Sequence, residues 1–262
     1  MAKYFILWKA FFLNSLTRDM EFKANFLGGL FIDIIYYGSY FFFFSIIFAF
    51  VDDIGVFTKQ DVTIFLVITF LTDTLYMMFF AGNIWRLNRY IVRGDLDYIL
   101  LKPVNTQFFV SLRYVKSYAL VSVVILVIIL LQLVLGSNNH ITMTNVAFFI
   151  PSFLMGVSLW VSIDFIISCL AFWFKNFGSA GWLGHEVMKF GTRPDTIYTG
   201  WMRKLMFSIL PLAFVSSVPT RILLFGPDFT FLVGQVIAST LMFVVAQIIW
   251  YNGVKRYESA SS

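Results

Sequence analysis

Five apolar runs, each long enough to cross a lipid bilayer, constrain this chain more than any other feature of its sequence. A transmembrane helix needs about 20 mostly apolar residues. The runs cover residues 26–50, 61–84, 114–136, 146–174 and 229–252. Charged residues make up only 13% of the chain, whereas soluble domains carry about 25%. The sequence therefore predicts an all-α, polytopic integral membrane protein with a single transmembrane domain over residues 1–262.

A sixth apolar run, residues 203–224, decides the predicted topology. It contains Pro211, Pro219 and Arg221. If this run spans the bilayer, the chain has six transmembrane helices and both termini lie on one side. Of the 19 Lys and Arg residues, all but Lys59 and Arg221 then face that side. Because cytoplasmic loops are rich in Lys and Arg, both termini are predicted to be cytoplasmic.

A second topology is open for the region between the fourth and the last span. Residues 176–191 would form a short span, and the Pro-broken segment 193–228 would lie outside and dip back into the membrane. This arrangement moves four cations to the outer side: Lys189, Arg193, Arg203 and Lys204. The distribution of positive charge prefers the first topology.

Residues 3–24, at the N-terminus, have a different pattern from the spans. Tyr4, Trp8, Phe11 and Phe12 recur at helical spacing, while most of the charged residues fall elsewhere on the helix. This pattern predicts an amphipathic helix that lies on the cytoplasmic membrane surface. The alternative is a simple extension of the first span.

Three acidic residues fall inside the predicted spans: Asp33, Asp73 and Asp164. An Asp at the centre of a transmembrane helix costs about 2.5–3.5 kcal/mol on insertion scales. Acids inside membranes often line substrate pathways or relay protons. Neighbouring Ser, Thr and Tyr side chains also allow each Asp to be a hydrogen-bonded contact between helices. Both interpretations stay open.

The stretch RGDLDYILLKPVN, residues 93–105, lies in a charged cytoplasmic loop predicted over residues 85–113. Gly94 permits a bend, and Asp95 is a favourable N-cap for a short helix. Asp97 falls in the first turn and Lys102 at the end, where the helix dipole favours a negative and a positive charge respectively. Pro103 then ends the helix.

The predicted short helix has one apolar face, because Leu96, Ile99 and Leu100 recur at helical spacing. The helix is too short to span a bilayer. Its apolar face must therefore rest on the membrane surface, on the protein's own helices or on a partner.

Motifs for ATP, metal or catalysis do not occur in the sequence. It has no G-x-x-x-x-G-K-[ST] phosphate loop, so the chain is not expected to bind or hydrolyse ATP. His140 and His185 are isolated and no Cys/His cluster occurs, so no metal, cofactor or catalytic residue is predicted. The lone Cys169 is expected to be a small buried residue. Topology accounts for the net charge of +5, so no nucleic-acid partner is predicted.

Three stretches, in this order, resemble the membrane-spanning permease subunits of type-2 ABC transporters, in the branch with subunits of this length and six spans. RGDLDYILLKPVN is similar to the family's Gly-x-x-Asp-x-x-Leu-x-x-Pro loop after the second span. RPDTIYTGWMRKLMFSILPLAFVSSVPTRILL is similar to its Pro…Arg…Pro-Leu-Ala…Pro stretch before the last span. IIWYNGVKRYESASS is similar to its Trp-x-x-Gly-x-x-Arg-Tyr terminus. The three acids within the spans are not markers of this family.

The resemblance implies an exporter subunit of the bacterial cytoplasmic (inner) membrane that pairs with itself or with a second permease. Two cytosolic ATPase subunits, which carry the ATP and the Mg²⁺, would bind below. The loop after the second span would form a coupling helix that docks into a cleft of the ATPase. The residues that would form or border that helix are Arg93, Gly94, Asp95, Leu96, Asp97, Leu100, Lys102 and Pro103.

Two other functions compete with this one. A proton-coupled secondary transporter would use Asp33, Asp73 and Asp164 as proton sites and would need no ATPase. A membrane scaffold would transport nothing. The resemblance also favours the second topology for 193–228, because type-2 exporters in general place broken, re-entrant helices outside, just before the last span.

Overall fold

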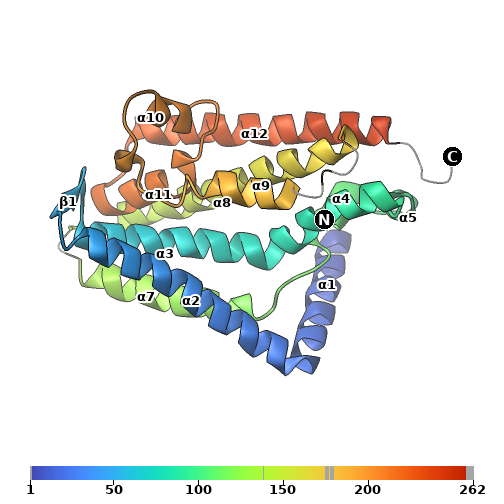
Figure 1. Ribbon diagram of the computed structural model, residues 1–262, viewed down its shortest axis with the longest axis horizontal. Helices are drawn as coiled ribbons and strands as arrows, with labels where there is room; N and C mark the ends of the chain where they lie inside the picture. Colours follow the sequence, from blue (N-terminus) through green and yellow to red (C-terminus); the bar gives the residue numbers. More distant parts are fainter. Residues whose placement is uncertain (1, 138, 175–176, 178–179, 258–262) are drawn as a thin grey trace.

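The computed structural model describes residues 2–137, 139–174, 177 and 180–257, and helices dominate this part of the chain. Most of the helices run along the long axis of the molecule, while α1 stands across them (Figure 1). Four helical segments are long and apolar enough to cross a membrane: Lys23–Ile47, Lys59–Arg93, Met143–Phe172 and Phe229–Arg256. Two apolar helices are shorter, Ala119–Leu135 and Ala213–Phe225. These elements agree with an all-α membrane protein, while the count of six spans stays a prediction.

The segment Lys59–Arg93 forms the centre of the core and is not one uniform helix. It consists of α3 (Lys59–Tyr76), a π-helical turn η1 (Met77–Ala81) and α4 (Gly82–Arg93). Thr58 caps α3 in a reciprocal capping box with Asp61, which satisfies two backbone donors at the helix start. Nearly every side chain of α3 is buried, so the other helices pack around it.

The second half of the core is built from α8 (Met143–Cys169), its continuation η2 (Leu170–Phe172), α11 (Ala213–Phe225) and α12 (Phe229–Arg256). Gly156 lets α8 and α11 approach closely, because a Cβ there would lie 2.3 Å from the carbonyl oxygen of Val215. Helices α2 (Lys23–Ile47) and α7 (Ala119–Leu135) cover the other side of α3 (Figure 1). Cys169 is buried, as expected.

The all-α prediction missed a small β-hairpin. Strand β1 (Asp53–Ile54) pairs antiparallel with β2 (Phe57–Thr58), and Gly55 takes a φ of 67° in the turn between them. The hairpin lies at one end of the long axis, here called the hairpin end. The N-terminus and the last described residues lie toward the other end, here called the termini end (Figure 1).

Residues 193–228 do not form the single span over 203–224 that the charge distribution preferred. They fold as η3 (Asp195–Ile197), α10 (Gly200–Met206) and α11. Arg203 and Arg221, which that topology puts on opposite sides of the membrane, both bind the carboxylate of Asp195, each at 2.9 Å. The Thr196 hydroxyl also donates to the carbonyl oxygen of Ile54, in the hairpin. Through these contacts η3 and α11 lie at the hairpin end, while the side of the membrane that the segment faces stays a prediction.

The N-terminal helix α1 (Ala2–Glu21) is not a straight extension of the first span. The chain leaves helical geometry at Phe22, with φ −100° and ψ 65°, and α1 meets α2 at a steep angle (Figure 1). A location on the membrane surface stays a prediction, because it depends on where the bilayer lies.

Helices α2 and α12 expose long apolar faces. Only 11% of the most apolar window of each helix is buried inside the protein. The exposed side chains include Phe31 and Phe42 on α2 and Val236 and Phe243 on α12. Soluble proteins rarely expose apolar patches of this extent, so these faces are suited to lipid or to another subunit.

Candidate functional site

The predicted coupling helix is a one-turn helix at the termini end. Helix α4 ends at Gly94, whose φ of 78° lies in the left-handed region that glycine adopts without strain. The chain turns there and forms α5 (Leu96–Leu100), followed by α6 (Thr106–Leu112). The sequence predicted both the bend and the short helix, because Gly94 and Pro103 punctuate the loop.

The predicted apolar face of α5 is divided between the protein's own core and the surface. Leu96 is fully buried and Ile99 is 3% exposed, so both belong to the core. Leu100 is 37% exposed, whereas Tyr98 and Leu101 are 73% and 84% exposed. Leu96 therefore anchors α5 to the bundle. The side chains available to a partner are those of Tyr98, Leu100 and Leu101.

The two acids at the start of α5 take the predicted positions, Asp95 at the N-cap and Asp97 in the first turn, but the predicted cap is incomplete. Asp95 occupies the N-cap position, but its side chain makes no capping hydrogen bond within the described chain. Asp97 lies beside the phenol of Tyr257, just after α12. Burial, and then the negative charge of Asp97, raise the pKa of that phenol to about 12. The loop motif and the C-terminal Arg-Tyr motif thus meet in space.

Helix α1 contacts the loop that follows α5. The Lys3 ammonium donates to the Pro103 carbonyl oxygen at 2.9 Å, and the backbone N–H of Asn105 donates to the Tyr4 hydroxyl at 3.2 Å. The ring of Tyr4 packs edge-on against Phe108, with 5.0 Å between centroids. The start of α1 and the loop after α5 therefore form one continuous surface.

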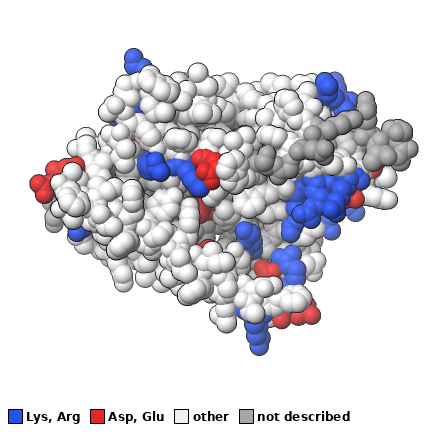
Figure 2. All heavy atoms as spheres, in the orientation of Figure 1, with Lys and Arg blue, Asp and Glu red and all other residues white. Residues whose placement is uncertain are grey.

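Cations gather around this surface, and several lie over aromatic rings. The Arg86 guanidinium lies 4.1 Å from the centre of the Tyr114 ring, and the Arg113 guanidinium lies 5.0 Å from that of Phe109. Lys102 approaches the Phe109 ring at 5.5 Å. Figure 2 shows a concentration of Lys and Arg at the termini end. Within the described residues, none of Arg86, Arg89, Arg93, Lys102 and Arg113 forms an ion pair.

The three intramembrane acids lie in two different environments. Asp164 is buried where α3, α8 and α9 (Ala180–Met188) meet. Its carboxylate accepts a hydrogen bond from Tyr76 of α3, and a Cβ on Gly184 of α9 would collide with it. Asp164 is thus a polar contact between helices.

Asp33 and Asp73 instead line one cavity of about 220 Å³. Asp33 accepts a hydrogen bond from Ser122 at 2.7 Å, and Asp73 accepts a long one from Tyr37 at 3.4 Å. Lys116 and His185 also line this cavity. Sequence reasoning treated His185 as isolated, because its approach to the acids depends on how α9 packs.

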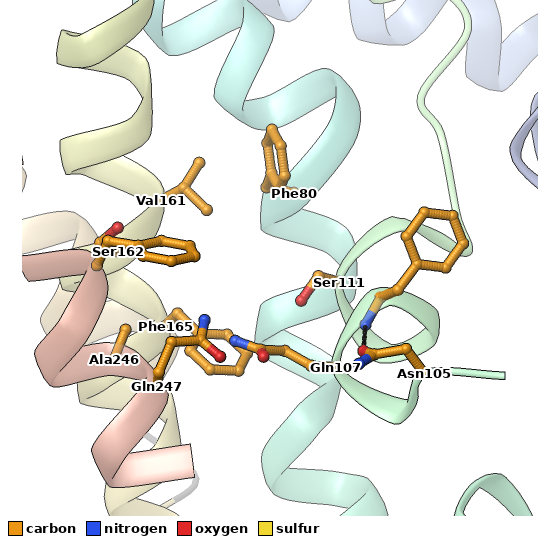
Figure 3. Close-up of a pocket in the computed structure, with 11 residues that line it drawn as sticks. Phe80, Asn105, Gln107, Ser111, Val161, Ser162, Phe165, Ala246 and Gln247 are labelled. Carbon is orange, nitrogen blue, oxygen red and sulfur yellow. Dashed lines mark hydrogen bonds between the residues drawn. The ribbon is translucent and has the colours of Figure 1, made fainter. Parts of the chain in front are cut away.

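A second cavity, of about 420 Å³, lies between η1, α6, α8 and α12. Its wall is mainly apolar and includes Phe80 and Phe165. Gln107 from α6 and Gln247 from α12 point toward each other across it (Figure 3). The loop after α5 therefore leads directly into a wall of this cavity.

In the described part of the chain, no three or more His, Cys, Asp or Glu side chains lie close enough together to hold a metal ion. The site at the termini end offers exposed apolar side chains and cations. It is therefore suited to contact with another protein.

A family model of the ABC-2 family transporter proteins matches residues 34–261. No curated protein and no solved structure matches the chain. The matched range covers all of the described helices except α1 and the start of α2, and it includes the loop with α5. This chain therefore belongs to the ABC-2 family of transporter proteins, as the resemblance predicted, and is a multi-pass membrane protein of a permease type.

Proposed function

We propose that this chain is the permease subunit of an ATP-driven exporter, and that separate cytosolic ATPase subunits bind it at the termini end. Membership of the ABC-2 family supports a partner of this kind. The chain would catalyse no reaction itself. ATP and Mg²⁺ would bind to the partner.

The observation that carries this proposal is the division of α5 between core and surface. A helix anchored by Leu96 and Ile99 transmits a push on its exposed side to α4 as a rigid unit. Exposed Tyr98 and Leu101 supply apolar contact area, and aromatic anchors commonly dominate protein interfaces. The unpaired cations around α5 would meet acidic groups of the ATPase at the edge of the contact.

The experiment that tests this contact is co-purification of the permease with its ATPase after Leu101→Glu. A charge at a side chain that is 84% exposed should leave the fold intact and weaken the complex. Leu135→Glu is the matched control, because Leu135 is 86% exposed but lies at the far end of α7. Equal recovery of the ATPase with Leu101→Glu and with the wild type would contradict the proposed interface.

Two permeases would form the translocation path together, and the apolar faces of α2 and α12 are the candidate contact surfaces. Cys169 is the only cysteine in the chain and is buried, so cysteines introduced on these faces can be cross-linked without interference. Val236→Cys or Phe31→Cys should give a cross-linked dimer if its helix faces the second subunit. Failure of cysteines along both helices to cross-link would argue against a dimer through these faces.

The proposed location is the bacterial cytoplasmic membrane, with both termini in the cytoplasm and residues 193–228 outside. Trp201 is 71% exposed in α10 at the hairpin end. Trp201→Cys in intact cells should react with a thiol reagent that cannot cross the membrane, whereas Leu101→Cys should react only after lysis. The reverse pattern would invert the topology.

A further inference from the structure

We infer that the cavity between α2, α3, α7 and α9 is a binding site for an organic ammonium group. Its lining includes Asp33, Asp73, Lys116 and His185 together with Tyr36 and Tyr118. This site is separate from the proposed ATPase contact and does not depend on it. The residues of this cavity combine an imbalance of charge, unpaired buried atoms and aromatic walls.

The charges in the cavity do not balance. Asp33 and Asp73 contribute two carboxylates, and Lys116 contributes the single ammonium. Among the described residues, the Lys116 ammonium has one weak partner, the Met77 sulfur at 3.8 Å, and it forms no salt bridge with a carboxylate there. With both acids ionised, the cavity carries one negative charge in excess, and a buried charge of this kind is either paired with a cation or neutralised by a proton. An added cation removes this excess.

Two residues of the lining, Asp73 and His185, also carry a buried polar atom without a hydrogen-bond partner among the described residues. Asp73 is only 5% exposed, and its Oδ1 has no hydrogen-bond partner among the described residues. The Nδ1 atom of His185 is unpartnered within the same part of the chain. Leaving such an atom unpaired costs about 1–3 kcal/mol. An ammonium N–H donor that binds Asp73 would remove that cost, and His185 could accept from the same group.

The aromatic walls favour an organic cation over a metal ion. Tyr36, Tyr37 and Tyr118 surround the acids, and the face of a tyrosine ring attracts ammonium groups. Divalent metals prefer several oxygen ligands in a regular shell, whereas this cavity offers two carboxylates and a competing lysine. A volume of about 220 Å³ is enough for a small amine or for the headgroup of an aminolipid.

The same chemistry has two possible sources, a free amine or an amine-bearing lipid headgroup. Tyr118 also lines a groove at the bend between α1 and α2, together with Phe22 and Phe26. This groove lies where the N-terminal helix meets the first span, and Tyr118 is common to its lining and to that of the cavity. The test below separates the two sources.

The experiment measures choline binding to the full-length protein in nanodiscs of anionic lipid by equilibrium titration. Choline is the cationic probe, and dimethylbutanol, its uncharged isostere, is the control ligand. Choline should bind and the isostere should not. Equal binding of both ligands, or no choline binding, would overturn the inference.

Three substitutions should change choline affinity in different directions, a pattern that misfolding would not produce. Asp73→Asn should weaken choline binding about tenfold or more, because it removes one of the two carboxylate charges that attract the quaternary ammonium group. Lys116→Gln should strengthen choline binding, because it removes the competing cation. Asp164→Asn, at a buried acid outside the cavity, should leave the affinity unchanged. An unchanged affinity in Asp73→Asn, or a weaker one in Lys116→Gln, would refute the site.

Lipid composition separates the two sources. In nanodiscs that contain phosphatidylethanolamine, a site filled by lipid headgroups should show a lower apparent choline affinity than in phosphatidylglycerol. A site for free amines should show the same affinity in both. Either result supports an ammonium site. A lower affinity in phosphatidylethanolamine identifies a lipid headgroup as the occupant, and equal affinities identify a free amine.

Discussion

The two ends of the molecule treat their charges in opposite ways. At the hairpin end, Asp195 is fully buried and holds both Arg203 and Arg221, and the Arg221 guanidinium also covers the Phe57 ring at 4.9 Å. At the termini end, Arg86, Lys102 and Arg113 lie over aromatic rings and form no salt bridge among the described residues. Charge at the hairpin end is thus used for internal structure, whereas charge at the termini end is left for a partner.

The largest effect expected from this difference is at Asp195. Asp195→Asn should lower the free energy of unfolding by about 3–5 kcal/mol, because it leaves Arg221 as a largely buried, uncompensated charge. Thermal unfolding in detergent measures the loss. Arg203→Gln is the control, since the Arg203 side chain is 45% exposed and a pair at the surface contributes about 1 kcal/mol or less. Equal losses for the two variants would show that Asp195 is not the centre of a buried network.

Leu96→Ala should cost about 2–5 kcal/mol, the usual range for a buried leucine. Leu101→Ala should change stability by about 0.5 kcal/mol or less, because the side chain is exposed. Chemical or thermal unfolding compares the stability of the two variants. In co-purification, Leu101→Ala should lose more of the ATPase than Leu96→Ala. If Leu96→Ala is tolerated as well as Leu101→Ala, α5 is not anchored as described.

Gly94→Ala should cost about 1–2 kcal/mol, because the left-handed region is strained for a residue with a Cβ. Gly200, with a φ of 58° and open space where a Cβ would be, makes a matched control at the hairpin end. Both variants should lose similar stability in a thermal melt. Only Gly94→Ala should reduce ATPase activity in the assembled transporter. If the two variants have equal ATPase activity, the bend at Gly94 has no part in coupling.

The smallest effect is expected at Tyr257. Its phenol has a pKa raised to about 12 by burial and by Asp97, so the folded state binds its proton more tightly than the unfolded state does. The stability that this proton contributes is present below the ordinary pKa of 10 and is lost as the pH rises toward 12. Melting curves between these values should fall more steeply for the wild type than for Tyr257→Phe. Parallel curves would mean that the phenol is not perturbed.

The sequence predicted the bend at Gly94 and the helix after it, because both follow from local preferences. It did not predict that Leu96 is buried while Leu101 is exposed, since that depends on where α4 directs the helix. The sequence also did not predict that 203–224 is divided between two helices. The charge rule counts Arg203 and Arg221 as free cations, whereas Asp195, distant from Arg221 in sequence, binds both of them. His185 was missed because only the packing of α9 brings it to Asp73.

The π-helical turn η1 interrupts the long central segment between α3 and α4. Met77, in this turn, lines the cavity with the two acids, and Phe80, three residues later, lines the cavity with the two glutamines. A π turn widens the backbone and breaks the regular ladder of α-helical bonds, and long helices commonly kink at such turns. A twist that enters at α5 and travels along α4 would therefore be released at the one turn that borders both cavities, and would reshape them together.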